Sequence, residues 1–193
     1  MISLNALFSE LAKVFDTANK FEALAKLALE KTTNMSLETN EHYLNKNIVD
    51  AMTQNDSHPV CEAILRTPLN WLPPTTSYDP LYVQHSVAKA HVELIGPTGL
   101  VKSKTIRIGL YGMPANTEYG IRTHPADEIY VMLAGKAYWK VNKKPYILHQ
   151  TGDRSYHPSM VKHANRTGEE AFMSIYVWHG DISTENYVYN GIS

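Results

Sequence analysis

The sequence predicts a mainly β fold, a small β-barrel or jelly roll, with a helical segment in front of it. Up to about residue 70, apolar side chains recur at helical spacing. Residues 67–80 then hold four prolines and no helical periodicity. From residue 81 onward, about eight short β-like runs follow one another without an intervening helix. We therefore expect a helical segment (1–70) packed on the barrel, a proline-rich linker or lid (71–80), and the barrel itself (81–193).

Four helices are expected in the first part of the chain. Ser3 can cap a first helix over residues 4–15. Residues 21–31 continue with helical spacing, and a third helix, entered at residues 38–41, extends to Met52. Pro59 is suited to the first turn of a short fourth helix that contains Cys61.

The expected strands are separated by turn signals rich in glycine, proline and asparagine, such as residues 96–99 and 142–145. They cover residues 82–87, 90–95, 105–113, 120–124, 128–134, 137–141, 146–149 and 171–178.

Composition excludes several classes of protein. The 193 residues are 44% hydrophobic, which is enough for a core, and the net charge is −1, so no basic surface for nucleic acid or an anionic membrane is expected. Cys61 is the only cysteine, which rules out an intramolecular disulfide and a zinc ribbon and favours a buried helical thiol. No run approaches the roughly twenty apolar residues of a membrane span. We expect a cytoplasmic protein without nucleic-acid or membrane partners, and a homodimer is compatible with the sequence.

The chemistry is expected at residues 124–135, where an alternating run points a carboxylate and a phenol to the same face. Glu128 and Tyr130 share one face of this strand with Met132, and the intervening residues form the apolar face. His124 lies just upstream across Pro125, and His163 follows later in the chain. Two histidines and a glutamate form a ligand set suited to zinc, iron, manganese or nickel.

These residues resemble the two motifs of the cupin superfamily, whose members are small β-barrels. His124, Glu128 and the closing Gly135 fit the first motif, whereas Gly152, Pro158 and His163 fit the second. The sequence departs from the motifs at four positions. Asn116 and Met160 replace glycines, Arg122 replaces the first histidine, and Asn165 lies two positions earlier than the asparagine of the motif.

Within the cupins, the chain is similar to the dimethylsulfoniopropionate (DMSP) lyases and their lyase-like relatives, which carry His, Glu, Tyr and His around one metal. The similarity rests on the Glu128-x-Tyr130 pair, the run at residues 135–139, Tyr119 and Trp178. It implies a carbon–sulfur lyase that acts on a small sulfonium carboxylate. The reaction would be metal-dependent β-elimination of DMSP, or a related propionate, to dimethyl sulfide and acrylate.

The resemblance also gives roles to residues. One divalent ion, with zinc or iron favoured over manganese or nickel, is expected on His124, Glu128 and His163, with Tyr130 as a candidate fourth ligand. Near a dication a phenol loses its proton more easily, so Tyr130, or failing that Tyr119, is the expected general base. The alternative is that Tyr130 only fills the barrel.

Substrate binding is expected from Arg122 and from a wall of Tyr156, His157 and Trp178. Arg122 could hold a carboxylate through paired N–H donors, or form a rim salt bridge to Asp127, Glu118 or Glu128. Aromatic side chains would attract a sulfonium cation, although packing alone also explains them.

Two other functions use the same residues. A dioxygenase or an isomerase could share the ligand set, because the fold does not choose the reaction. A cupin that binds a small carboxylate without turnover is the third interpretation.

Overall fold

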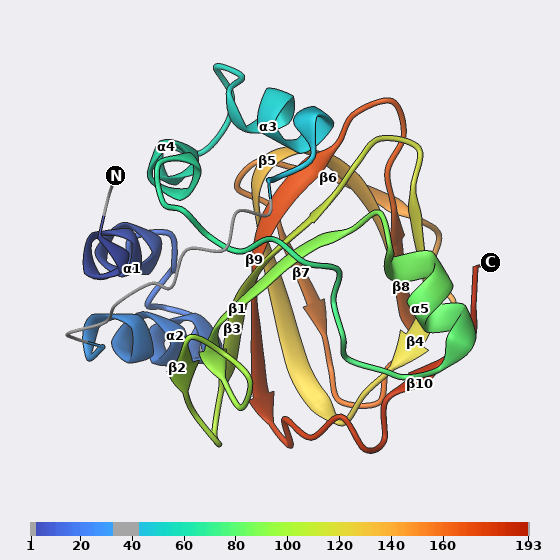
Figure 1. Ribbon diagram of the computed structural model, residues 1–193. Helices are drawn as coiled ribbons and strands as arrows, with labels where there is room; N and C mark the ends of the chain where they lie inside the picture. The colour runs from blue at the N-terminus through green and yellow to red at the C-terminus, as the bar shows by residue number, and fades with distance from the viewer. Residues whose placement is uncertain (1–2, 33–42, 193) are drawn as a thin grey trace.

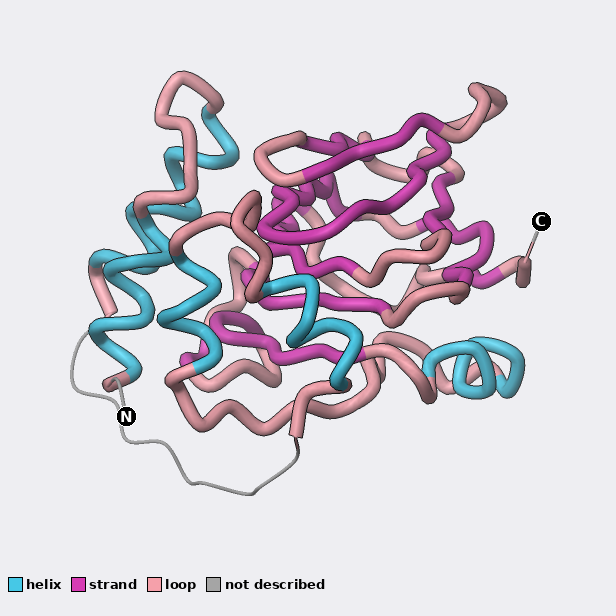
Figure 2. Tube along the Cα trace, turned by 90° about the horizontal axis from the view of Figure 1, so that it is seen from above, coloured by secondary structure: helices cyan, strands magenta, loops and turns pink. Residues whose placement is uncertain are grey.

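The computed structural model describes residues 3–32 and 43–192 (Figure 1). Four of the five helices in the described part of the chain lie before residue 70, and the view from above shows several helices at one side of the strands (Figure 2). The four are α1 (Leu4–Ala12), α2 (Lys20–Glu30), α3 (Lys46–Met52) and α4 (Val60–Leu65). Ser3 caps α1 as predicted, because its side chain accepts a hydrogen bond from the Ala6 N–H. The predicted entry of the third helix at residues 38–41 lies outside the described residues. No helix in the described part of the chain is long and apolar enough to cross a membrane.

A fifth helix, α5 (Pro80–Ser86), occupies the place where a strand was predicted at residues 82–87, so that prediction was wrong. The Asp79 carboxylate accepts hydrogen bonds from the N–H groups of Leu81 and Tyr82, and Pro80 fits the first turn. The Asp-Pro pair is thus a helix-start signal that outweighs a short alternating run.

Ten strands follow in the described part of the chain, and four of the short ones escaped prediction because two to four residues carry too little pattern. They are β1 (Ala90–Gly96), β2 (Val101–Lys102), β3 (Arg107–Met113), β4 (Glu118–Thr123), β5 (Ala126–Val141), β6 (Ile147–Gln150), β7 (Arg154–His157), β8 (His163–Arg166), β9 (Phe172–Gly180) and β10 (Val188–Tyr189). The strands not predicted are β2, β7, β8 and β10. The sheet does not close on itself, and the fold is a jelly-roll-like β fold of the cupin type preceded by helices, as predicted.

The long strand β5 connects the two halves of this fold. The predicted strand ended before Gly135, whereas β5 continues through it to Val141. The part before Gly135 pairs with β7 and β9, and the part after it pairs with β6 and β8. Gly135 has φ 67°, and a Cβ placed there would lie 1.9 Å from the Ala171 carbonyl oxygen. Glycine is therefore required where β5 passes from one half to the other.

Two positions where the cupin motifs carry glycine keep the backbone conformation that glycine favours. Asn116 has φ 55° and Met160 has φ 59°. The Met160 N–H donates to the His124 carbonyl oxygen at 2.8 Å, so this turn is connected to a candidate metal ligand.

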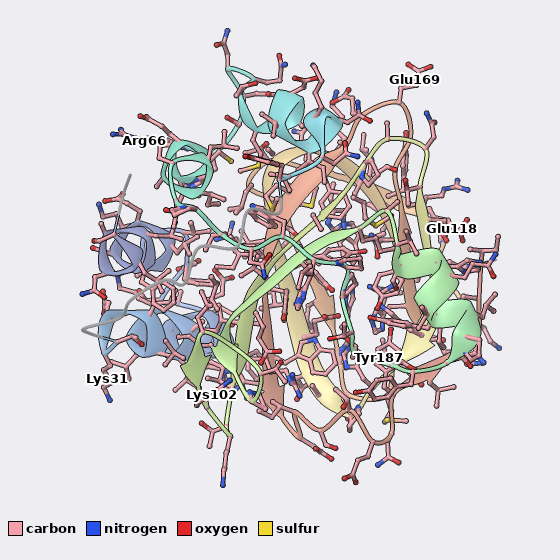
Figure 3. All side chains as sticks on the ribbon, in the orientation of Figure 1. Lys31, Arg66, Lys102, Glu118, Glu169 and Tyr187 are labelled. Atoms are coloured by element: carbon pink, nitrogen blue, oxygen red, sulfur yellow. The ribbon has the colours of Figure 1, made fainter. Side chains whose placement is uncertain are left out.

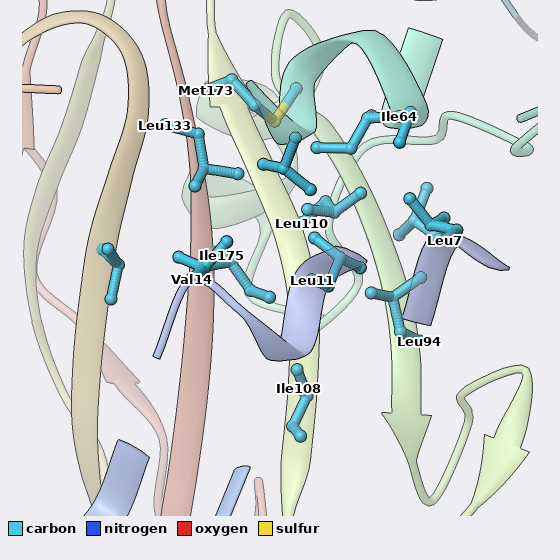
Figure 4. Close-up of a cluster of buried hydrophobic side chains, with 14 of the residues drawn as sticks. Leu7, Leu11, Val14, Ile64, Leu94, Ile108, Leu110, Leu133, Met173 and Ile175 are labelled. Carbon is cyan, nitrogen blue, oxygen red and sulfur yellow. The ribbon is translucent and has the colours of Figure 1, made fainter. Parts of the chain in front are cut away.

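The two faces of β5 meet two different cores, as the alternating pattern predicted. Ile129, Val131 and Leu133 belong to a core shared with the helices, whereas Tyr130 and Met132 belong to an aromatic core between the strands. Figure 4 shows the first core, with side chains of the helices and of the strands in one cluster. Its helical members include Leu7, Leu11 and Ile64.

Helix α4 is also joined to β5 by polar contacts. The His58 N–H donates to the Leu133 carbonyl oxygen at 2.7 Å, and the Cys61 thiol donates to the same oxygen at 3.4 Å. Cys61 is buried in a helix as predicted, and burial raises the pKa of its thiol to about 12. The domain limits 1–70, 71–80 and 81–193 stay a prediction.

Candidate metal centre and its cavity

Glu128 lies at the centre of the candidate site, on the face of β5 opposite the helices, and is only 2% exposed. In the sheet its direct neighbours are His157 on β7 and Trp178 on β9. The Trp178 indole N–H donates to Glu128 Oε1 at 2.5 Å, and His157 Nδ1 lies 2.8 Å from Glu128 Oε2. The carboxylate is therefore held from both sides by residues of the adjacent strands.

Two further histidines approach the same carboxylate oxygen. His124 directly follows β4, and its Nδ1 lies 3.1 Å from the Ala126 carbonyl oxygen, whereas His163 begins β8, with its Nδ1 2.9 Å from the Val161 carbonyl oxygen. A proton on each Nδ1 can be donated to these carbonyl groups, which leaves the Nε2 lone pairs free to act as ligands. Each Nε2 lies 3.3 Å from Glu128 Oε2.

This arrangement fits a metal ion. His163 Nε2 is buried and makes no hydrogen bond among the described residues. A lone pair facing a carboxylate is unfavourable unless a cation lies between them. Adjacent ligands of a tetrahedral ion with bonds of about 2.0–2.1 Å lie about 3.3 Å apart, which matches the two separations from Glu128. The ligand atoms of His124, Glu128 and His163 all lie within 4.8 Å of one another.

The charges of the three groups also suit a divalent ion. Burial alone would raise the pKa of Glu128, but its electrostatic interaction with His124 and hydrogen bonding to the neighbouring imidazoles hold it well below its ordinary value. Burial, together with the charge of Arg122, lowers the pKa of His163 well below its ordinary value. At neutral pH, Glu128 is thus an anion and His163 a neutral imidazole, which are the forms that bind metals.

Tyr130 lies two residues beyond Glu128 on the same face of β5 and is 5% exposed. Its ring contacts Trp139, with 4.5 Å between the ring centroids, and lies 5.9 Å from Tyr111. Burial raises the pKa of Tyr130 well above its ordinary value, and the negative charge of Glu128 raises it further. Tyr130 is therefore a protonated phenol unless a cation acts on it.

A cavity of about 510 Å³ opens in front of Glu128 and Tyr130. The proline-rich segment forms one wall of it, with Pro74, Thr75, Thr76, Ser77 and Tyr78. The other side chains that line it are His91, Glu93, Thr98, Arg107, Tyr111, Tyr119, Arg122, Tyr176, Trp178, Thr184, Glu185 and Tyr187. Residues 74–78 belong to the segment predicted as a linker or lid, and that role stays a prediction.

Tyr119 is paired with a residue near the C-terminus. Its hydroxyl lies 2.6 Å from the Tyr187 hydroxyl, and both side chains line the cavity. Figure 3 shows Tyr187 beside the strands, whereas Lys31 and Arg66 belong to the helical side. Burial raises the pKa of Tyr119 well above its ordinary value.

Arg122 lines the cavity and is 1% exposed. Its Nη2 donates to Asn165 Oδ1 at 3.0 Å, and its Nη1 donates to the carbonyl oxygens of Tyr119 and Gly120 at 3.3 and 3.4 Å. The guanidinium carbon lies 3.8 Å from the centre of the Tyr119 ring. All three acceptors are neutral, which argues against the alternative of a rim salt bridge.

The three predicted wall residues lie in different places. Trp178 lines the cavity and stacks on His124, with 4.2 Å between the ring centroids. His157 is fully buried behind Glu128, where Ser155 Oγ lies 2.8 Å from its Nε2. On β7, Tyr156 lies between the inward-facing Ser155 and His157, so its side chain faces outward. There it stacks on Phe21 and is 43% exposed. The structure therefore does not bring Tyr156 to the cavity.

Three tyrosines of the cavity wall were not identified from the sequence. Tyr111 alternates with Gly109 and Arg107 along β3, and Tyr176 is two residues from Trp178 on β9. Strand parity alone could have found both. Tyr187 precedes a strand of two residues and gives no such signal.

Comparison with known proteins gives a family, a curated relative and a number of solved structures. The dimethylsulfoniopropionate lyase family matches residues 64–174. Dimethylsulfoniopropionate lyase DddQ of Ruegeria pomeroyi is 38% identical over 91 residues, which are 47% of this chain and 45% of that relative, so the match spans less than half of the relative.

Two of the solved structures cover nearly the whole chain. The crystal structure of DMSP lyase DddQ from Ruegeria pomeroyi DSS-3 has a TM-score of 0.64 at 26% identity, covering 95% of this chain and 96% of that one. A chain from the crystal structures of the DMSP lyases RdDddP and RnDddQII has a TM-score of 0.67 at 18% identity, with coverages of 97% and 100%. At that identity the second likeness shows the fold alone.

Proposed function

Because the chain belongs to the dimethylsulfoniopropionate lyase family, we propose that it is a carbon–sulfur lyase that cleaves DMSP, or a related propionate, to dimethyl sulfide and acrylate. The observation that carries the proposal is the meeting of His124, Glu128 and His163, of which Glu128 lines the cavity, inside the region that matches the family. A small sulfonium carboxylate is the substrate class that follows.

His124, Glu128 and His163 would hold one divalent ion, and Tyr130 is the candidate fourth ligand. Zinc and iron are favoured, and manganese and nickel accept the same ligand set. When bound, the ion supplies Lewis-acid chemistry that makes the hydrogens beside the substrate carboxylate more acidic.

The elimination itself needs a base and a dry cavity. Tyr130, as the phenolate, would take the proton from the carbon next to the carboxylate, while the carbon–sulfur bond breaks and its electrons leave with neutral dimethyl sulfide. Tyr119 is the alternative base, although its hydroxyl is already paired with Tyr187. Arg122 would bind the carboxylate and Trp178 would face the sulfonium group. The segment at residues 74–78 would limit the access of water.

The replacement Tyr130→Phe tests the assignment of the base. We expect it to keep at least most of the bound metal, because the two histidines and the glutamate remain, yet to release almost no dimethyl sulfide. Headspace detection of dimethyl sulfide, after loading with zinc, iron, manganese or nickel, measures turnover, and elemental analysis measures metal content.

Tyr138→Phe is the matched control, since Tyr138 is 37% exposed and does not line the cavity. Substantial turnover by Tyr130→Phe together with loss of activity in Tyr119→Phe would move the role of base to Tyr119. Oxygen consumption by the iron-loaded protein without release of dimethyl sulfide would instead indicate an oxygenase.

A further inference from the structure

A buried cation and a buried hydroxyl group lie at the cavity wall without an acidic hydrogen-bond partner among the described residues. The Arg122 guanidinium donates to neutral oxygens, although the charge of Glu128 also acts on it. The Tyr111 hydroxyl is buried on β3 near the Asn165 side chain but makes no hydrogen bond of normal geometry among the described residues. Both side chains line the cavity that contains Glu128. Burying a charge that has only neutral acceptors costs free energy, and so does burying a hydroxyl group that has no hydrogen-bond acceptor. An anionic ligand that accepts hydrogen bonds from both groups would remove this cost.

The two groups are close neighbours. The Tyr111 ring lies 5.8 Å from the Tyr119 ring, over which the Arg122 guanidinium is placed. Burial raises the pKa of Tyr111 well above its ordinary value, and this outweighs the charge of Arg122, which acts in the opposite direction. The Tyr111 hydroxyl therefore keeps its proton and can donate it to an anion.

A second basic side chain lies behind the Tyr119 ring, which lines the cavity. Lys89 is 3% exposed, and its Nζ lies over the Tyr119 ring, 4.0 Å from the ring centre. Tyr176 and Trp178 add aromatic surface to the wall of the same cavity. A guanidinium together with aromatic surface suits a monocarboxylate with a short apolar tail more than a highly charged anion.

We propose that Arg122 and Tyr111 form a carboxylate-binding site that holds small monocarboxylates, such as acrylate and propionate, without any help from a metal ion. Arg122 would contribute charge and Tyr111 one hydrogen bond, which would orient the acid group. The naming of acrylate as a ligand rests on the proposed lyase function, whereas the site itself needs no turnover. Arg122 stands where the cupin motif carries a histidine, so the site would be a property of this chain.

The test measures binding to the metal-free protein. The full chain, stripped with a chelator and dialysed, is titrated calorimetrically with acrylate and propionate, and with propionamide as a neutral analogue of the same shape. We expect both acids to bind and the amide to bind at least tenfold more weakly. A hydrogen bond to a charged group accounts for roughly a tenfold to hundredfold change in affinity, so Tyr111→Phe should weaken acid binding by that factor.

A second measurement separates ligand binding from a structural role. Tyr111→Phe removes only an oxygen atom that lacks a partner, so its thermal unfolding temperature without ligand should equal or exceed that of the wild-type protein. Tyr138→Phe, outside the cavity, should bind the acids as the wild-type protein does. Arg122→Gln should abolish acid binding, and if it does not fold, the Tyr111→Phe titration still decides the matter.

Equal binding of propionate and propionamide, or unchanged acid binding by Tyr111→Phe, would overturn the proposal. A protein that binds the acids as expected but releases no dimethyl sulfide when loaded with metal would refute the lyase function and leave this site in place. If the metal-loaded protein released dimethyl sulfide but the metal-free protein did not bind the acids, the carboxylate-binding site would be refuted and the lyase function would stay.

Discussion

Glu128 depends on two residues that no ligand motif includes. The Trp178 indole donates to one carboxylate oxygen, and His157 lies within hydrogen-bond distance of the other. Groups that hold a metal ligand in place commonly contribute a factor of about 10–100 to metal affinity. The candidate metal site thus extends at least one layer beyond His124, Glu128 and His163.

We expect Trp178→Phe to weaken metal binding by about tenfold to a hundredfold, because the aromatic packing stays while the hydrogen bond is lost. Competition against a chelator of known affinity measures the change. Trp139→Phe is the control, since its buried indole N–H has no hydrogen-bond partner among the described residues. Equal metal affinity in the two variants would show that the Trp178 hydrogen bond does not support the site.

Lys89 should give the protein a distinctive dependence of stability on pH. Burial lowers its pKa from 10.5 to about 7, and the charge of Arg122 acts in the same direction. Between these values the unfolded chain binds more protons at Lys89 than the folded protein, so the free energy of unfolding should rise with pH from about 7 to 10.

Lys89→Met lacks this contribution, so its stability should rise less over the same range. Urea unfolding at pH 7, 8 and 9 measures the free energy of unfolding of both proteins. In the difference between them, the contributions of the other titrating groups largely cancel. A constant difference between the two proteins would contradict the lowered pKa.

The meeting of the three candidate metal ligands was predictable at this scale, whereas the residues that contact Glu128 from the adjacent strands were not. His124, Glu128 and His163 follow from motif spacing and strand parity. His157 was identified, but as a wall residue, because its role depends on the register between β5 and β7. Register joins residues that are far apart in sequence, and a single sequence carries little information about it.

At the scale of elements, β5 requires glycine at position 135, where it passes from one half of the fold to the other. Gly135→Ala should lower the free energy of unfolding by roughly 2–4 kcal/mol, since alanine disfavours a positive φ and its Cβ would collide with the Ala171 carbonyl oxygen. Urea unfolding measures the loss.

Gly152→Ala is the matched control for this change. Gly152 also has a positive φ, 91°, but nothing lies within 4 Å of the added Cβ. We expect a loss of only about 1 kcal/mol from backbone strain. If both alanine variants lost the same stability, the close approach of Ala171 would not be the reason for glycine in β5.

The strengths and failures of sequence-based prediction differ from element to element. Long periodic runs such as α1, α2 and β9 were predictable, because many side chains repeat one pattern. The six residues at 82–87 were too few to separate strand from helix, and Asp79 decided the outcome through its cap. The continuation of β5 beyond Gly135 was hidden because a glycine usually interrupts a strand pattern.

For the molecule as a whole, a partly buried ion pair joins the helical segment to the strands. Arg154 on β7 donates to both carboxylate oxygens of Glu22 on α2, each at 3.1 Å, and to the Val14 carbonyl oxygen at 3.2 Å. The Glu22 side chain is buried, whereas the Arg154 side chain is 35% exposed. The contact lies three residues from His157, so the helices are connected to the layer that supports Glu128.

Glu22→Gln should therefore destabilise the protein by about 1–3 kcal/mol, less than a fully buried pair would, because Arg154 is partly solvated. Urea unfolding measures the loss, and hydrogen exchange of residues 20–30 should increase. Glu62→Gln removes an exposed pair with Arg66 and should cost less than about 1 kcal/mol. Similar losses in the two variants would mean that the Glu22 pair does not secure the helices.

The alternation of β5 links assembly of the protein to its chemistry. Because side chains on a strand alternate, a slip of one residue would turn Glu128 toward the helices and Ile129 toward the cavity. Metal coordination and helix docking would then fail in the same molecules. In a refolded sample, the number of metal ions bound per protein molecule would thus give the fraction of molecules in which β5 has formed in the correct register.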